Sequence, residues 1–298
     1  MKKLEIRDPG YTILLKAFKQ HLEVLNYSGG TVYNAVNYTR EYLFYLETTH
    51  TNLRRVQDLA HYFQYLECRV NERRGGGLST GSLHKHRSCL RLFYDFLRLT
   101  QGIESVRFPL LPRATRSPVV LTVAQVKQLF DVCDSSLLGK RNKALLALYY
   151  GLGLRRSEGV NLELTDMDFP KEEVLIRKSK THRQRVVPMS DYVKEILEDY
   201  VFNVREKLIP DDDQTACFLV TERGKPLSKE SVSYLIRKLV KSSKIKQKAS
   251  VHTLRHSIAT HLLNQGMSLE NIALFLGHTS LDSTQLYTHL NTKTDENI

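Results

Sequence analysis

The sequence predicts a mainly α-helical protein of two domains, the second of which is mixed α/β with a small antiparallel sheet. Three observations lead to this prediction. Apolar residues recur every three or four positions through residues 1–105, which is the period of an amphipathic helix. A proline-rich stretch follows at 108–118. Beyond it, two short alternating stretches interrupt further helical patterns, as a hairpin would. A length of 298 residues is also typical of two domains.

The first domain is predicted to consist of four helices. The first covers residues 11–25, and the glycine pair in NYSGGT ends it. Thr31 is the expected N-cap of the second helix. A third helix is expected over 53–70 and a fourth over 79–99, separated by the glycine-rich loop RRGGGLS. This part of the chain is therefore expected to be all-helical.

The stretch FPLLPRATRSP contains three prolines and two arginines. Proline at this density stops helices and stiffens a connection. We therefore predict a helical domain at 1–107, an interdomain linker at 108–118 and a second domain at 119–298. The linker is either a basic strap along a phosphate backbone or a plain connector.

The second domain combines helices with two predicted strands. Thr122 is an expected N-cap, and 141–150 is a strongly apolar helix. The stretches EEVLIRKSK and RQRVVPM alternate and are rich in branched residues, which predicts a hairpin with the THR sequence at its tip. Five more helices are expected over 190–207, 228–243, 252–264, 268–276 and 280–290.

The composition indicates a polyanionic partner. The net charge is +12, and both parts are basic: residues 1–112 carry 16 Lys and Arg against 10 Asp and Glu, and the remainder carries 28 against 22. Basic proteins commonly bind nucleic acid, although a merely soluble basic surface has the same totals. No apolar run approaches the ~18 residues of a membrane span, and no signal peptide follows MKKLEIRDPG.

The four cysteines lie far apart, without a CxxC pair. This spacing argues against a zinc knuckle and a disulfide framework, and it favours buried thiols in a reducing cytoplasm. They are Cys68, Cys89, Cys133 and Cys217.

Two stretches carry candidate cations. In GLGLRRSEGVNL, Glu158 lies three residues after Arg155, within reach on a helix. This is either an arginine positioned by a carboxylate or a surface ion pair. In RKSKTHRQRVVP, Lys180 lies at the tip of the predicted hairpin. It either projects into a groove or belongs to an ordinary polar turn.

The stretch HTLRH places two imidazoles and a guanidinium within about one helical turn. His252 and His256 share a face, and Arg255 lies close to it. Such crowding needs an anion nearby or neutral histidines. The zinc motif HExxH does not fit, because Thr253 replaces the acid. His261, in SIATHLL, is interpreted as a packing residue.

A fourth stretch, LGHTSLDSTQLYTHL, contains His278 in a predicted turn and Tyr287 on the last predicted helix. No acidic cluster suited to Mg²⁺ accompanies these residues. A phosphodiester needs its charge neutralised in the transition state, and guanidinium groups donate forked hydrogen bonds to phosphate oxygens. The anion that neutralises these cationic side chains is therefore predicted to be a phosphate in nucleic acid.

The stretches GLRRSE, SKTHRQRVVP, HTLRHSIATHLLNQG and LGHTSLDSTQLYTH resemble the tyrosine recombinase (phage integrase) family. The last two match its consensus almost position for position. The resemblance spans the whole chain, because the first 110 residues look like the family's helical, SAM-like core-binding domain. It is closest to simple members such as Xer and small transposon or integron recombinases, so we expect no arm-binding domain.

The resemblance implies an enzyme that cuts and rejoins DNA. Tyr287 would attack a phosphate, form a 3′-phosphotyrosyl bond and release a 5′-hydroxyl. Arg155 and Arg255 would hold the phosphate, and Lys180 would protonate the leaving 5′ oxygen. The covalent bond conserves energy for resealing, so neither a nucleotide cofactor nor an obligatory metal is expected, and the sequence contains no GxxxxGK[ST] loop.

Three further residues receive roles from the same resemblance. His252 would act in general acid/base catalysis on the tyrosine. His278 occupies the family's His/Trp position and would hydrogen-bond the phosphate. Glu158 occupies the position of an acid that orients the site.

The resemblance also implies the partners. They are double-stranded DNA with an inverted-repeat core site, three further copies in a tetramer that exchanges strands through a Holliday junction, and a partner recombinase or accessory protein. Only 11 residues follow Tyr287, which is short for a helix that docks on a neighbour. The expected location is the cytoplasm, at the nucleoid. The alternatives are a type IB topoisomerase, a DNA-binding protein without catalysis, and a metal-dependent hydrolase built on HTLRH.

Overall fold

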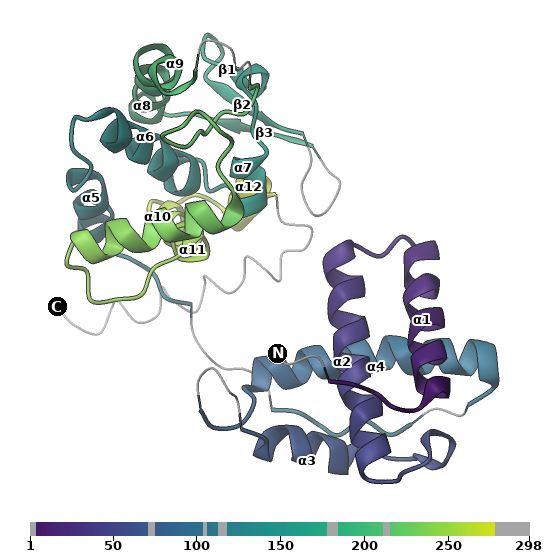
Figure 1. Cartoon of the computed structure of the whole chain (residues 1–298). Coiled ribbons are helices and arrows are strands. Elements are labelled where there is room, and N and C mark those ends of the chain that lie inside the picture. Colours follow the sequence, from purple (N-terminus) through teal and green to yellow (C-terminus); the bar gives the residue numbers. More distant parts are fainter. Residues whose placement is uncertain are drawn as a thin grey trace, which may run out of the picture. The chain divides into compact units, whose positions relative to one another are not determined.

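The computed structural model describes residues 4–70, 75–103, 106–112, 118–177, 184–210 and 215–277. The chain divides into two compact units, Met1–Arg116 (unit 1) and Ser117–Ile298 (unit 2) (Figure 1). Unit 1 is helical, and unit 2 combines helices with one small sheet. The predicted mainly helical fold with a mixed second domain is confirmed. No described helix combines the length and apolar character that crossing a bilayer requires.

The described residues of unit 1 form four α-helices around an aromatic-rich core: α1 Pro9–Val24, α2 Gly29–Thr48, α3 Ala60–Cys68 and α4 Thr80–Gln101. The predicted first, second and fourth helices are confirmed to within a few residues. The second begins earlier than expected, because the side chain of Ser28 caps it by accepting from the N–H of Thr31. The sequence had placed the cap at Thr31 itself.

The prediction of one helix over 53–70 is wrong in its first half. Leu53–Arg55 is a short 3₁₀ helix, and α3 begins only at Ala60. The side chain of Asp58 accepts from the N–H of Ala60, and Asp58 bridges to Arg107. Further along, Phe108 and Leu111 pack against the core of unit 1.

Unit 2 begins with α5 Val123–Asp131, α6 Leu137–Leu146 and the π-helical turn Ala147–Gly151. Thr122 caps α5 in a reciprocal capping box with Gln125, as predicted for this threonine. The short helix α7 Arg156–Val160 and the 3₁₀ helix Leu164–Asp166 follow.

The antiparallel sheet of unit 2 has the strand order β1-β2-β3. Its strands are β1 Met167–Asp168, β2 Glu173–Ile176 and β3 Arg185–Pro188. The predicted hairpin is confirmed as β2 and β3. Strand β1 was not predicted, because its two residues are too few to show an alternating pattern. Val174 pairs with Val187 and Ile176 with Arg185. Directly paired residues project to the same face, so Arg185 lies on the face that buries Val174, Ile176 and Val187.

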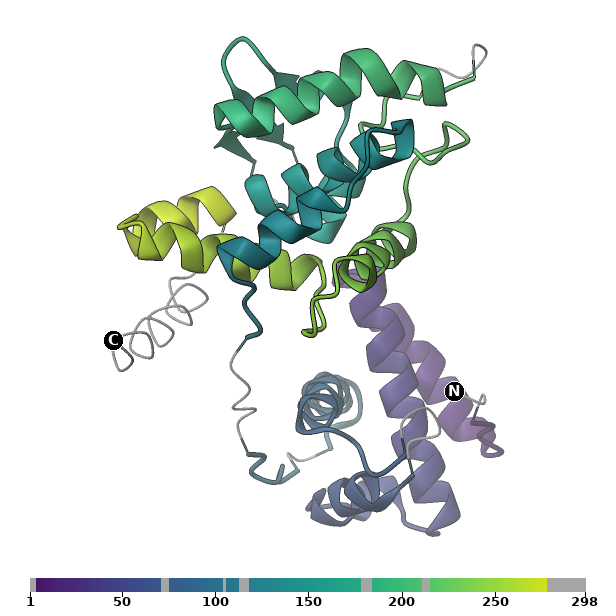
Figure 2. The same cartoon turned by 90° about the vertical axis from the view of Figure 1, so that its left-hand side faces the viewer.

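The remaining helices of the described part of unit 2 are α8 Asp191–Asp199, the π-helical turn Tyr200–Arg205, α9 Glu206–Leu208, α10 Lys229–Ser242, α11 Val251–Asn264 and α12 Leu269–Leu276. These agree with the predicted helices over 190–207, 228–243, 252–264 and 268–276. α11 packs against α12 and against the π-helical turn after α6 (Figure 2). The helix predicted over 280–290 lies outside the described residues.

Candidate active site

Arg155 and Glu158 come together at the start of α7. Arg155 is the N-cap of this helix, and Glu158 is its third residue. The main-chain N–H of Arg155 donates to Oε2 of Glu158 at 2.8 Å, and its guanidinium donates to Oε1 at 2.8 Å. Glu158 is only 3% exposed. The carboxylate is therefore buried and the Arg155 side chain is only partly exposed, so the two do not form an ordinary surface ion pair.

Arg185 is a second partner of Glu158 that the sequence analysis missed. Its guanidinium donates to Oε1 of Glu158 at 3.0 Å and to Oε2 at 2.8 Å. The signal was present in RQRVVPM, because alternation puts Arg185 on the same strand face as Val187, which is buried. An arginine on a buried strand face needs an internal partner, and Glu158 supplies it.

The two arginines determine the protonation state of Glu158. Burial alone would raise the pKa of its carboxyl group. The hydrogen bonds and the charge of Arg185, together with the main chain and guanidinium of Arg155, outweigh burial and lower the pKa to about 2. Glu158 is therefore ionised at any physiological pH, and it holds two guanidinium groups beside it.

Arg255 approaches the same region from α11. Ser250 caps this helix by accepting from the N–H of Thr253, which confirms the predicted helix start around HTLRH. Arg255 is 5% exposed. Its guanidinium donates to the carbonyl oxygens of Gly153 and Leu276. It therefore links α11 both to the loop before α7 and to the end of α12.

The C-terminal end of α12 gathers all three arginines. A helix end leaves carbonyl groups without an intrahelical donor and carries a partial negative charge. Three successive carbonyls at this end each accept from a different guanidinium. The pairs are Phe275 with Arg185 (3.1 Å), Leu276 with Arg255 and Gly277 with Arg155 (2.7 Å). In the structure, a helix end and Glu158 thus provide the negative counterpart for the crowded cations.

Two glycines permit this close approach. Gly277 has φ 64°, and a Cβ atom there would lie 2.8 Å from Nη1 of Arg185. Gly153 has φ 58°, and a Cβ atom there would lie 2.7 Å from Cδ2 of Leu276. Both positions need a left-handed backbone and the absence of a side chain. Larger residues would separate the end of α12 from the arginines.

The two histidines of HTLRH have lowered pKa values. For His252, desolvation is the largest cause, followed by the positive charges of Arg255, Arg156 and Arg155. For His256, desolvation comes first, followed by His252 and Arg255. Both imidazoles are therefore neutral at neutral pH, so they do not add to the positive charge. A neutral His252 is suited to accept a proton.

His261 is a packing residue, as interpreted from the sequence. It is buried, and its Nδ1 lies 2.8 Å from the hydroxyl of Tyr150. The structure thus brings together Arg155, Glu158, Arg255 and His252 and adds Arg185 to them. The predicted site residues Lys180, His278 and Tyr287 lie outside the described residues.

Replacing Glu158 by Gln is expected to destabilise the protein in a pH-dependent way. A depression of the pKa from the ordinary 4.5 to about 2 corresponds to about 3 kcal/mol of stability. This contribution is fully present above pH ~4.5 and is lost as the pH falls towards ~2, because the native state must then bind a proton. The difference in melting temperature between the wild type and E158Q should therefore shrink as the pH falls from 6 to 3.

Glu163→Gln is the matched control, because Glu163 pairs with Arg177 in an exposed ion pair. Exposed pairs contribute only about 0–1 kcal/mol. A difference for E158Q that is as small as that for E163Q at pH 6 would show that the buried carboxylate does not stabilise the cluster.

Comparison with known proteins identifies the family of this chain. The model of the phage integrase family matches residues 119–294. The tyrosine recombinase XerC of Bacillus subtilis (strain 168) is 34% identical over 286 residues, which cover 93% of this chain and 91% of that protein. The tyrosine recombinase XerD of Oceanobacillus iheyensis is 32% identical over 217 residues, which cover 72% of this chain and 73% of that protein.

Solved structures share the fold. XerH site-specific recombinase bound to a palindromic difH substrate matches with a TM-score of 0.74 at 18% identity, covering 96% of this chain and 86% of that one. A lambda integrase dimer bound to a COC' core site matches with a TM-score of 0.71 at 17% identity, covering 96% and 98%. From the sequence and family matches, this chain belongs to the phage integrase family of tyrosine recombinases.

Proposed function

We propose that this chain is a site-specific recombinase that cuts and rejoins double-stranded DNA through a 3′-phosphotyrosyl intermediate and exchanges strands through a Holliday junction. The observation that carries the proposal is the cluster of Arg155, Arg185, Arg255 and Glu158 at the end of α12. The cluster has three positive charges against one negative. The end of α12 immediately precedes, in the sequence, the stretch that carries His278 and Tyr287.

The net positive charge suits a scissile phosphate. Arg155 and Arg255 are assigned to its non-bridging oxygens, because a guanidinium offers five N–H donors and can hold a carbonyl and a phosphate together. Their existing hydrogen bonds fix their orientation before DNA arrives. A preorganised donor costs no reorganisation when the negative charge of the transition state develops. His278 is assigned a further hydrogen bond to the phosphate.

Proton transfer completes the proposed reaction. A phenol with a pKa of about 10 requires about 4 kcal/mol for ionisation at pH 7. Tyr287 loses its proton to neutral His252 as its oxygen bonds to phosphorus. The bond from phosphorus to the 5′ oxygen breaks, and Lys180 donates a proton to that oxygen. The reverse steps reseal a new strand without ATP or another cofactor, because the phosphotyrosyl bond conserves the energy.

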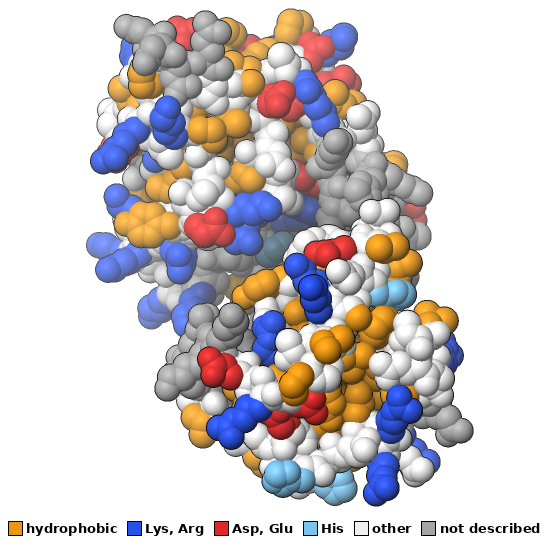
Figure 3. Space-filling view, turned by 45° about the vertical axis from the view of Figure 1, so that its right-hand side comes forward, with side chains coloured by type: hydrophobic (Ala, Val, Ile, Leu, Met, Phe, Trp, Pro, Cys, Tyr) orange, Lys and Arg blue, Asp and Glu red, His pale blue; other side chains and the backbone are white. Residues whose placement is uncertain are grey.

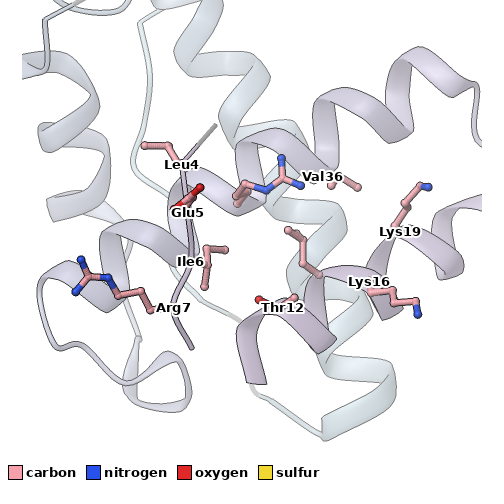
Figure 4. Close-up of a pocket in the computed structure, with 10 residues that line it drawn as sticks. Leu4, Glu5, Ile6, Arg7, Thr12, Lys16, Lys19 and Val36 are labelled. Atoms are coloured by element: carbon pink, nitrogen blue, oxygen red, sulfur yellow. The ribbon is translucent and has the colours of Figure 1, made fainter. Parts of the chain in front are cut away.

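Basic surfaces on both units support DNA binding. On unit 2, exposed side chains along α10 and the segment after it form the α10 stripe, which consists of Arg237, Lys238, Lys241, Lys244, Lys246 and Lys248. Figure 3 shows Lys and Arg side chains gathered over part of this unit's surface. On unit 1, the lining of a hollow of about 540 Å³ includes Arg7, Lys16, Lys19 and Arg40 beside Glu5 and several apolar side chains (Figure 4). Both surfaces suit phosphate groups.

Removing one lysine of the α10 stripe is expected to weaken DNA binding and to reduce its salt dependence. Each phosphate contact contributes about 0.9 to the slope of log K against log salt concentration. Lys241→Ala should lower the slope by about that amount. Fluorescence anisotropy titrations at salt concentrations from about 50 to about 200 mM measure the slope. Lys171→Ala is the matched control, because Lys171 is also exposed but pairs with Asp168. Equal slopes for both variants would exclude the α10 stripe from the DNA interface.

The proposed target is a core site with inverted repeats, bound by four copies that act together. The neighbours bound to a palindromic difH substrate and to a core site support this assignment, and a partner recombinase or accessory protein is part of the proposal. The protein is proposed to act in the cytoplasm, at the nucleoid. Trapping the covalent complex on cellular DNA and sequencing the attached fragments would identify the site.

A plasmid with two copies of that site then tests the function. A recombinase produces deleted or inverted products, which restriction digestion detects. A type IB topoisomerase, the alternative with the same chemistry, relaxes the plasmid and forms no recombinant. Relaxation without recombinants would overturn the proposed strand exchange.

A further inference from the structure

We propose that Arg185 is a positioning residue for strand cleavage, which holds Glu158 against Arg155 and the end of α12 at the same time. The inference rests on the proposed function, because the residues that it positions are those assigned to the phosphate. Arg185 itself is assigned no contact with DNA. It acts by fixing where Arg155 lies and where the chain leaves α12 towards His278.

The geometry around Glu158 carries the first part of this inference. Each carboxylate oxygen accepts from both arginines: Oε1 from the two Nη1 atoms, and Oε2 from the main-chain N–H of Arg155 and from Nη2 of Arg185. The carboxylate is therefore held from two sides. Without Arg185, the Glu158 side chain could rotate about its terminal torsion and carry the Arg155 guanidinium with it.

The contacts with α12 carry the second part. Nε of Arg185 donates to the carbonyl of Phe275 at 3.1 Å, and its side chain lies against Gly277, where a Cβ atom would clash with it. The side chain of Arg185 is only 10% exposed. One guanidinium thus joins β3, which returns from the hairpin of Lys180, to the start of α7 and to the end of α12. These are three of the four segments that bear proposed catalytic residues.

Arg205 provides the contrast within unit 2. Its guanidinium is also buried, but it donates to the main-chain carbonyls of Thr215, Cys217 and Phe218. These carbonyls belong to a single segment. Within the described residues, Arg205 forms no hydrogen bond with Arg155, Glu158 or α12. A purely structural arginine therefore looks different from Arg185.

The test compares Arg185→Gln and Arg185→Lys with the wild type. Single-turnover cleavage of a nicked core-site duplex gives the rate of covalent adduct formation, and anisotropy gives the dissociation constant of the DNA complex. Displacing a reacting group by about 1 Å lowers rates by about 100-fold, so we expect R185Q to cleave about 10- to 100-fold more slowly. Its dissociation constant should stay within about threefold, because Arg185 is not assigned to the interface.

Arg185→Lys keeps the positive charge but cannot fork to both oxygens of Glu158, so it is expected to cleave about as slowly as R185Q. Arg177→Gln is the matched control: Arg177 flanks the same hairpin and binds Glu163 and Thr165, outside the cluster. Arg177 also pairs with the buried carboxylate of Asp166, so R177Q is compared at a temperature where its melting curve shows that it is folded. There it should cleave within about twofold of the wild type, because none of the partners of Arg177 belongs to the cluster. If R185Q does not fold, as judged by its melting curve, R185K decides the test.

The double variant Glu158→Gln/Arg185→Gln shows whether the two residues act together. If Arg185 acts through Glu158, the rate of the double variant should lie close to that of E158Q, because coupled residues are not additive. The positioning role would be overturned if the rate losses of the two single variants multiplied in the double variant. It would also be overturned if R185K cleaved at the wild-type rate. A wild-type protein that forms no adduct would instead overturn the proposed function, so the two failures are distinguishable.

Discussion

Replacing Tyr287 by Phe is expected to abolish the covalent protein–DNA adduct while leaving DNA binding intact. The phenolic oxygen is the atom that bonds to phosphorus in the proposed reaction, and Phe removes it while keeping the ring. The adduct should fall below detection on a denaturing gel that separates free from protein-linked labelled DNA. Anisotropy should give the same dissociation constant for Y287F and the wild type, because the substitution changes no charge.

Tyr192→Phe is the control for this experiment, because Tyr192 is an exposed tyrosine on α8 with no assigned role. It should form adduct at the wild-type rate. The polarity of the bond is tested by labelling the cleaved strand at either end: the protein should carry the 3′ phosphate and leave a free 5′-hydroxyl. An adduct that persists in Y287F would place the nucleophile elsewhere in the chain.

Local signals made most of the fold predictable. Strong apolar periods identified the helices of both units, Thr122 was correctly predicted as the cap of α5, and alternation identified the hairpin. The exception at 53–58 has a local cause: the side chains of Asn52 and Asp58 accept from the main-chain N–H groups of Arg54 and Ala60. Such side-chain hydrogen bonds compete with helix formation. The apolar pattern alone does not reveal whether the helix or the side-chain hydrogen bonds form.

The site was predictable where partners are close in sequence. Arg155 and Glu158 lie three residues apart, so helical geometry sufficed to pair them. The carbonyl groups of 275–277 were not predictable as acceptors, because every residue has one and only the tertiary fold selects three. From the sequence, a single anion, a phosphate, was expected to neutralise the cations. In the structure the end of α12 already provides partial negative charge beside the arginines.

Replacing Arg255 by Ala is expected to lower the rate of strand cleavage by about 100- to 1,000-fold, or ~3–4 kcal/mol of transition-state stabilisation, by analogy with the loss of one oxyanion donor. Arg255→Lys keeps the charge but not the fork, and it should recover only part of the rate. Single-turnover cleavage of a nicked duplex measures the rate, and anisotropy checks that each variant still binds DNA.

Arg205→Ala separates catalysis from folding in this experiment. Arg205 and Arg255 are both 5% exposed, and both donate to main-chain carbonyls of unit 2, so their removal leaves similar cavities and unpaired acceptors. The two alanine variants should therefore lose similar stability in thermal melts. Only R255A should lose cleavage at a temperature where both are folded. A loss of less than tenfold in R255A, or an equal loss in R205A, would mean that the Arg255 guanidinium does not hold the phosphate in the transition state.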